Sequence, residues 1–73
     1  MSIAGAIAAI KKINELQKSK IDNSSKEIAK LQRTKTHDKI ELEDVIQIEQ
    51  EKIKEAKNIK ELADDILKEL NDL

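Results

Sequence analysis

Aliphatic residues recur at intervals of three and four along both halves of the chain, which is the spacing of one side of an α-helix. In the first half these residues are Ile3, Ile7, Ile10, Leu16, Ile21, Ile28 and Leu31. In the second half they are Leu42, Val45, Ile48, Ile53, Ile59, Leu62, Ile66, Leu67, Leu70 and Leu73. The pattern predicts an all-α protein with a single domain, residues 1–73, made of one helix over about residues 2–34 and a second over about residues 38–72.

The midpoint of the chain, residues 34–38, is the predicted turn between the two helices. Lys30 and Arg33 precede it, where cations suit the negative end of a helix dipole, and Asp38 and Glu41 follow it, where acids suit the positive end. Asp38 and Glu41 also have the spacing of a capping box. A turn at this point folds the chain into an antiparallel helical hairpin.

Folding about this turn brings segments of matching character together. The residues 3–16, rich in Ile and Ala, would lie beside the aliphatic residues 57–70, and the polar residues 17–27 would lie beside the polar residues 49–57. The aliphatic residues expected to face one another near the turn are Ile28, Leu31, Leu42 and Val45.

The two halves also carry opposite charge. Residues 1–36 hold eight Lys or Arg and three acids, a balance of +5, whereas residues 37–73 hold six Lys and twelve acids, a balance of −6, and the two sum to the −1 of the chain. A basic helix attracts an acidic one, which helps register and orientation more than stability. The charge distribution therefore favours the hairpin.

The alternative architecture is one continuous helix in a parallel coiled coil. With Ile7 at heptad position a, that position also holds Ile21, Ile28, Leu42, Ala56, Ala63 and Leu70, and position d holds Ile3, Ile10, Leu31, Val45, Ile59, Ile66 and Leu73. Lys35 and Asp38 interrupt this frame at the midpoint. The flanking positions carry Ile13, Ile46, Ile48, Ile53, Leu62 and Leu67. Such a wide stripe suits a bundle of three or more helices.

The weakest helical stretch of the chain is residues 22–25, with the sequence Asp-Asn-Ser-Ser. Ser24 and Glu27 have capping-box spacing, so the first helix could kink or restart at this point. Because no Gly or Pro enforces a stop there, we expect one continuous helix.

Composition limits what the hairpin can do alone. Of its 73 residues 40% are charged, none is aromatic and none is Cys, so the core is aliphatic and no disulfide can staple it. A hairpin of this size buries little surface to offset its chain entropy. We therefore expect a homo-oligomer, or docking on another helical protein, to complete the core of a multi-helix bundle.

Few residues are suited to catalysis or ligand binding. His37 is the single histidine, and its neighbour Asp38 is accounted for as a helix cap. The acidic residues 41–44 and 64–65 lack the loop spacing of a calcium site. We expect no catalytic residue, no metal, no cofactor and no small-molecule substrate, so the protein is predicted not to be an enzyme.

Two other classes of partner give alternative hypotheses. Residues 3–13 begin with an apolar run up to Ile10, which Lys11 and Lys12 follow; this would suit a helix lying on an anionic membrane surface, although Trp and Phe are absent. The lysine-rich first helix could contact the phosphates of nucleic acid, but a single Arg and the lack of aromatic stacking residues speak against this.

The position of the lysines also bears on localisation. They follow the apolar run, whereas a secretory signal has its positive charge first, and the run is shorter than the roughly 20 residues that span a bilayer. With no signal peptide or transmembrane segment predicted, a cytoplasmic location is the default expectation, and secretion by a route without a signal peptide stays open.

The layout of two long helices resembles, in outline, the Trp-X-Gly family of small secreted helical hairpins and the small helical chaperones of bacterial secretion systems. The sequence contains no Trp, and therefore no Trp-X-Gly turn. The resemblance is limited to the outline.

The predicted function is that of a non-enzymatic protein–protein interaction module, such as a small helical adaptor, chaperone or inhibitor. Apolar anchors would supply affinity, and flanking charges would supply orientation. The partner-binding residues predicted for this role, all at the end far from the turn, are Ile3, Ile7, Ile10, Ile59, Ile66 and Leu70.

Overall fold

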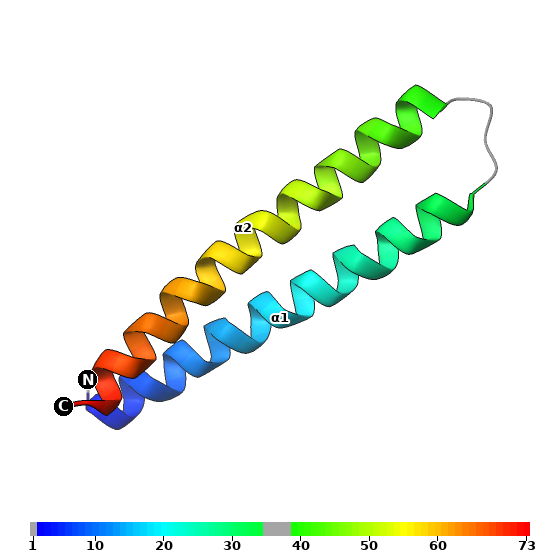
Figure 1. The fold of residues 1–73 in the computed structure, drawn as a ribbon. Coiled ribbons are helices and arrows are strands. Elements are labelled where there is room, and N and C mark those ends of the chain that lie inside the picture. The colour runs from blue at the N-terminus through cyan, green and yellow to red at the C-terminus, as the bar shows by residue number, and fades with distance from the viewer. Residues whose placement is uncertain (1, 35–38) are drawn as a thin grey trace.

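The computed structural model describes residues 2–34 and 39–73, and over those residues it consists of two helices. Helix α1 spans Ile3–Arg33 and helix α2 spans Lys39–Asn71. Figure 1 shows the two helices antiparallel, in contact with each other, with both termini at the same end. The predicted all-α helical hairpin is confirmed, and the alternative of one continuous coiled-coil helix is wrong.

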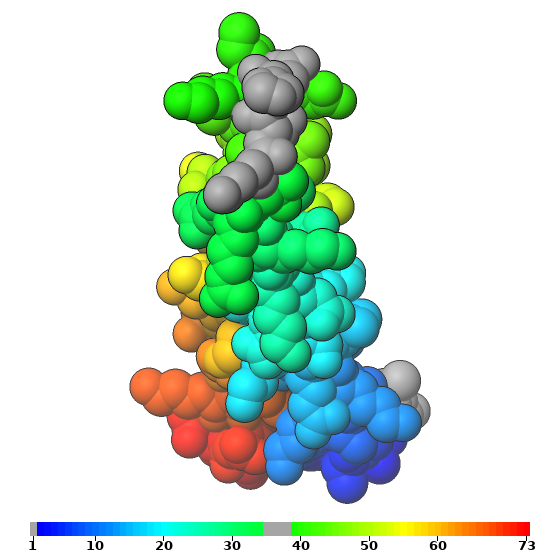
Figure 2. Space-filling model, turned by 90° about the vertical axis from the view of Figure 1, so that its right-hand side faces the viewer, coloured from blue at the N-terminus to red at the C-terminus, as the bar shows by residue number. Residues whose placement is uncertain are grey.

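The hairpin is long and thin, with extents of 56 × 16 × 14 Å. Its radius of gyration is 16.7 Å, whereas a compact chain of this length has a radius of about 11 Å. In the space-filling view of Figure 2, the side chains of both helices form one narrow column along the whole length. Each helix therefore has one helical neighbour and leaves most of its circumference without a protein contact.

Both described ends of α1 are capped by hydroxyl side chains. The Ser2 hydroxyl accepts a hydrogen bond from the Gly5 amide at 3.0 Å, which is an N-cap that the sequence analysis did not identify. At the other end the backbone of Thr34 is extended, and its hydroxyl donates to the Lys30 carbonyl at 3.0 Å. Helix α1 therefore ends on a β-branched residue that satisfies a free carbonyl. The capping role predicted for Asp38 lies outside the described residues.

Helix α1 runs without a break through residues 22–25, as expected, so the alternative of three helices is wrong. The two serines and the Asn and Asp of this stretch have weak helix propensity. Ser24 is nevertheless 7% exposed, because it packs against α2. Tertiary contact overrides the local preference here.

The contact between the helices follows one heptad row on each of them, which we call the inner seam. On α1 the inner seam consists of Ile7, Ile10, Asn14, Gln17, Ile21, Ser24, Ile28 and Leu31, and on α2 it consists of Leu42, Ile46, Glu49, Ile53, Ala56, Lys60, Ala63, Leu67 and Leu70, all buried or half-buried. The Asn14 amide nitrogen donates to the Asp64 carboxylate at 2.6 Å, which fixes residues 3–16 beside residues 57–70 as predicted.

The inner seam corrects the heptad frame drawn from the sequence. On α2 the expected position a lies at the seam, but three of the four aliphatic residues at the expected position d do not: Val45, Ile59 and Leu73 are exposed, whereas Ile66 is half-buried. Val45 therefore does not face α1, and Ile46 takes that place. The frame shifts between the helices because an antiparallel partner approaches α2 from a different side than a parallel one.

Candidate protein-interaction surface

A second heptad row on α2, which we call the outer row, lies beside the inner seam, and its residues are exposed except for the half-buried Ile66. Its residues, at alternating intervals of three and four, are Val45, Ile48, Lys52, Glu55, Ile59, Leu62 and Ile66. Ile48, Ile59 and Leu62 are 52%, 43% and 60% exposed, respectively. Large aliphatic side chains at this spacing form the contact face of helices that pack against other helices.

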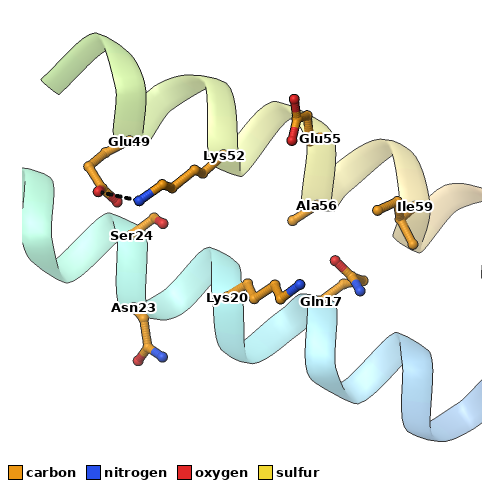
Figure 3. Close-up of a pocket in the computed structure, with 9 residues that line it drawn as sticks. All are labelled: Gln17, Lys20, Asn23, Ser24, Glu49, Lys52, Glu55, Ala56 and Ile59. Atoms are coloured by element: carbon orange, nitrogen blue, oxygen red, sulfur yellow. Dashed lines mark hydrogen bonds and ion pairs between the residues drawn. The ribbon is translucent and has the colours of Figure 1, made fainter. Parts of the chain in front are cut away.

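The outer row forms one wall of a groove along the hairpin. The groove is lined from α2 by Glu49, Lys52, Glu55, Ala56 and Ile59, and from α1 by Gln17, Lys20, Asn23 and Ser24 (Figure 3). Leu62 follows Ile59 by three residues, and Leu16 and Ile13 precede Lys20 by four and seven, so these three aliphatic residues extend the same two walls toward the termini. Ile13 and Leu16 are exposed as well.

Polar contacts hold the middle of this groove in register. The Lys52 ammonium donates to the Glu49 carboxylate at 3.1 Å. Figure 3 shows Ser24 of α1 next to Glu49, between the two helices. Two hydrogen bonds hold the pKa of Glu49 below its ordinary value; the one from Lys52 has the larger effect and the one from Ser24 the smaller. Glu49 therefore stays ionised at neutral pH and links α2 to α1.

The opposite side of the hairpin carries a matching polar link. Asp64 accepts from the Lys60 ammonium at 3.2 Å and from Asn14 across the helix pair at 2.6 Å. Both hydrogen bonds lower the pKa of Asp64, and the one from Lys60 has the larger effect. The groove on this side is lined by Lys11, Asn14, Glu15, Lys18, Ile21, Lys57, Lys60 and Leu67. Two of its eight lining residues, Ile21 and Leu67, are aliphatic.

Two side-chain oxygens in the inner seam lack a hydrogen-bond partner among the described residues. They are the carbonyl oxygens of Asn14 and Gln17. Gln17 is 4% exposed and lies opposite Ala56 and Ile59 in the groove (Figure 3). A buried carbonyl without a donor lowers stability. These two amide oxygens therefore lower the stability of the inner seam.

The six predicted partner-binding residues fall into two groups. Ile59 and Ile66 belong to the outer row, and Ile3 is exposed at the start of α1. Ile7, Ile10 and Leu70 are half-buried in the inner seam, where they already contribute to the contact between the helices. Whether any of the six contacts a partner stays a prediction.

The sequence analysis did not include Val45, Ile48 and Leu62 among the partner-binding residues. A signal for them was present, because Ile48 and Leu62 were noted as widening the stripe of α2 beyond a two-stranded seam. The aliphatic stripe of α2 is wide because it consists of two heptad rows, the inner seam and the outer row, whose members are neighbours in the sequence. Separating the rows requires knowing which of them faces α1.

In the part of the chain that the structure describes, no group of three or more His, Asp or Glu side chains is placed to hold a metal ion. His37 lies outside the described residues. Over residues 2–34 and 39–73, neither helix has a stretch long and apolar enough to cross a membrane.

Comparisons of the chain with known protein families, with curated proteins and with solved structures found no match.

Proposed function

We propose that the protein is a non-enzymatic interaction module, which binds a helical surface through the outer row of α2. The observation that carries this proposal is the exposure of Val45, Ile48, Ile59 and Leu62 along one line of α2. Each Ile or Leu side chain contributes about 1.5–3 kcal/mol when it is fully buried. The outer row thus holds a source of binding energy that the hairpin itself does not use.

The surface area of the hairpin supports the same conclusion. The chain exposes 5978 Å², whereas a compact monomer of this mass exposes about 4,600 Å². The difference is about 1,400 Å², and one side of a standard protein–protein interface buries about 800 Å². Covering one face of the hairpin would therefore bring its exposed surface close to that of an ordinary small domain.

In the proposed mode of binding, a partner helix lies along the groove beside the outer row. Ile59 and Leu62 act as anchors, together with Ile13 and Leu16 on the α1 wall, and Lys52 and Glu55 select the orientation of the partner. Of the residues predicted from the sequence, Ile66 and Ile3 extend the surface toward the termini. The partner is either a second copy of the chain or another helical protein.

The test compares the binding of three proteins to a helical partner: the full chain, its Ile59→Asp variant and its Ile40→Asp variant. Ile40 is 75% exposed and lies outside both heptad rows, so Ile40→Asp is a matched control for adding a charge. We expect the wild type and Ile40→Asp to bind a helical protein, which is either a second copy of the chain or another protein. Ile59→Asp should lose this binding.

Three results would overturn the proposal. The first is retention of the same partner by Ile59→Asp. The second is helicity and binding that appear only with anionic vesicles, which would indicate a peripheral membrane binder acting through residues 3–13. The third is retention on DNA or RNA that falls steeply with salt, which would indicate a nucleic-acid binder.

A further inference from the structure

We propose that the outer row binds a second copy of this chain, with the two α2 helices antiparallel and Lys52 of each chain facing Glu55 of the other. This inference rests on the proposed function and names its partner. It follows from the order of side chains along the outer row from Val45 to Leu62, which is complementary to itself when it is reversed.

The complementarity is visible layer by layer. In an antiparallel pair of heptad rows, a residue at the first position of one helix packs against a residue at the second position of the other. One register of the outer row pairs Val45 with Leu62 and Ile48 with Ile59 of the second copy. The same register pairs Lys52 with Glu55. A two-fold axis between residues 53 and 54 repeats each pair, so four of the six layers are aliphatic and the two at the centre are ion pairs.

Other arrangements of the same row place charges badly. A parallel pair would put Lys52 opposite Lys52 and Glu55 opposite Glu55. An antiparallel pair shifted by one heptad would put Lys52 and Glu55 opposite aliphatic residues, either Val45 and Ile48 or Ile59 and Leu62. An unpaired charge against an apolar surface is costly. The central pair thus selects one orientation and one register, which is the best-attested role of polar groups in helix interfaces.

The geometry of the charged residues permits the contact. The Lys52 side chain is 60% exposed although it pairs with Glu49, and an ammonium has three donors, so it can bind a second carboxylate. Glu55 has no ion-pair partner among the described residues. Figure 3 shows its carboxylate pointing away from α1. A lysine from a second hairpin would supply the missing partner.

Helix α1 adds to the same interface. Ile13 and Leu16 lie on either side of Asn14, which contacts Asp64, and just before Gln17, which lines the groove together with Ile59. In the proposed register, this is the level at which Val45 and Ile48 of the second copy arrive. The larger aliphatic patch near the termini of one hairpin therefore covers the smaller patch near the turn of the other. Each hairpin contributes the same two patches to the interface. Two copies therefore form a closed, two-fold symmetric dimer.

The register is tested by cross-linking single-cysteine variants, because the chain has no cysteine of its own. Ile48→Cys and Ile59→Cys change exposed positions and leave the inner seam intact. The two variants are mixed in equal amounts and oxidised mildly, and the disulfide-linked products are identified by mass spectrometry. The expected product is the 48–59 disulfide dimer. Residue 48 of one chain would lie about 16 Å along the axis from residue 48 of the other, so the 48–48 product should stay at background.

Background is set by Ile40→Cys, mixed with Ile59→Cys under the same conditions. A predominant 48–48 product would indicate a parallel dimer and overturn the proposal. A 48–59 yield no higher than the 40–59 yield would overturn it as well, since it would show collision without a specific interface.

Charge reversal tests the central pair independently. Lys52→Glu places two acids opposite each other and Glu55→Lys places two lysines, so each variant alone should self-associate about tenfold more weakly than the wild type. An equimolar mixture of the two variants should regain wild-type association, because every facing pair is again of opposite charge. Effects within one chain, such as the loss of the Lys52–Glu49 pair, cannot be reversed by mixing.

No gain of association in the mixture would overturn the charge pairing. The failure of the self-pairing proposal is distinguishable from that of the proposed function. A wild-type chain that stays monomeric, yet binds another helical protein in a manner abolished by Ile59→Asp, would refute self-pairing and leave the interaction module in place.

Discussion

The inner seam and the outer row of α2 have the same number of large aliphatic residues but differ in whether another helix covers them. The inner seam, which is covered by α1, has its most buried positions at Ala56 and Ala63, and it includes the charged residues Glu49 and Lys60. The outer row, which is exposed except for Ile66, has large aliphatic residues at five of its seven positions. The inner seam of α2 also has five large aliphatic residues, Leu42, Ile46, Ile53, Leu67 and Leu70. The two faces are therefore similarly apolar, and α1 covers only one of them.

This difference indicates a division of labour between the two faces. Small residues in the inner seam allow the helices to approach closely, and its polar contacts fix their register. Among the described residues no Ile, Leu or Val is fully buried, so the seam contributes limited hydrophobic stabilisation. Association through the outer row would supply the remainder, and folding and assembly would then be coupled.

The largest effect is expected from charging the outer row. The double variant Ile59→Asp and Leu62→Asp should weaken self-association on the order of a hundredfold or more, because each carboxylate would be buried without a partner. Helicity at a given concentration should fall with it, since the hairpin alone is marginal. Circular dichroism and sedimentation velocity measure both quantities, with Ile40→Asp as the control. An unchanged mass in the double variant would refute the role of the outer row.

A smaller effect is expected from enlarging a side chain in the inner seam. Ala56→Leu should destabilise the hairpin by about 1–3 kcal/mol, because the added atoms separate the helices. Ala8→Leu makes the same change at an exposed position of α1 and should have little effect. Urea unfolding followed by circular dichroism compares the two variants. Equal stability would mean that the seam is loosely packed at Ala56.

Removing an unsatisfied polar group should strengthen the inner seam. Gln17→Leu replaces a buried amide whose oxygen has no hydrogen-bond partner among the described residues, so the free energy of unfolding should rise by about 1 kcal/mol. Gln47→Leu, at an exposed position of α2, serves as the control. If Gln17→Leu lowers the free energy of unfolding, the amide makes a favourable contact that this account lacks.

The smallest effect concerns the polar links at the two sides of the seam. The pKa values of Glu49 and Asp64 are lowered in the folded chain. Their contribution to stability is therefore present above the unfolded pKa values of about 4 and is lost as the pH falls through the lower folded values. Thermal unfolding should show a decline in stability below about pH 4. The double variant Glu49→Gln and Asp64→Asn should flatten it, and an identical pH profile in that variant would contradict this assignment.

The sequence was sufficient to predict the hairpin because several independent signals agreed on it. The charge of the two halves, the matching of apolar and polar segments, and the placement of Lys30 and Arg33 before the turn all favoured an antiparallel pair. The expected neighbours of Asn14 and Ser24 on α2 lie where the mirror pattern placed them. Helix caps were harder to predict from the sequence. The N-cap Ser2 was not predicted, although it stands directly before the first apolar run.

The sequence could not decide which row of α2 faces α1. Both rows have the same spacing, and both contain Ile and Leu, so periodicity alone does not distinguish them. The structure separates them by size, because Ala56 and Ala63 permit the close approach that Ile59 and Leu62 would prevent. Ile59 therefore stays a predicted contact to a partner, whereas Ile7 and Leu70 already contribute to the contact between the two helices.

The most direct test of the central claim is sedimentation equilibrium on the wild-type chain, with circular dichroism recorded at the same concentrations. We expect a mass that rises toward twice the 8.3 kDa of one chain, with helicity that rises in step. A fully helical monomer at every concentration would contradict it, because the hairpin would then be stable without covering its outer row.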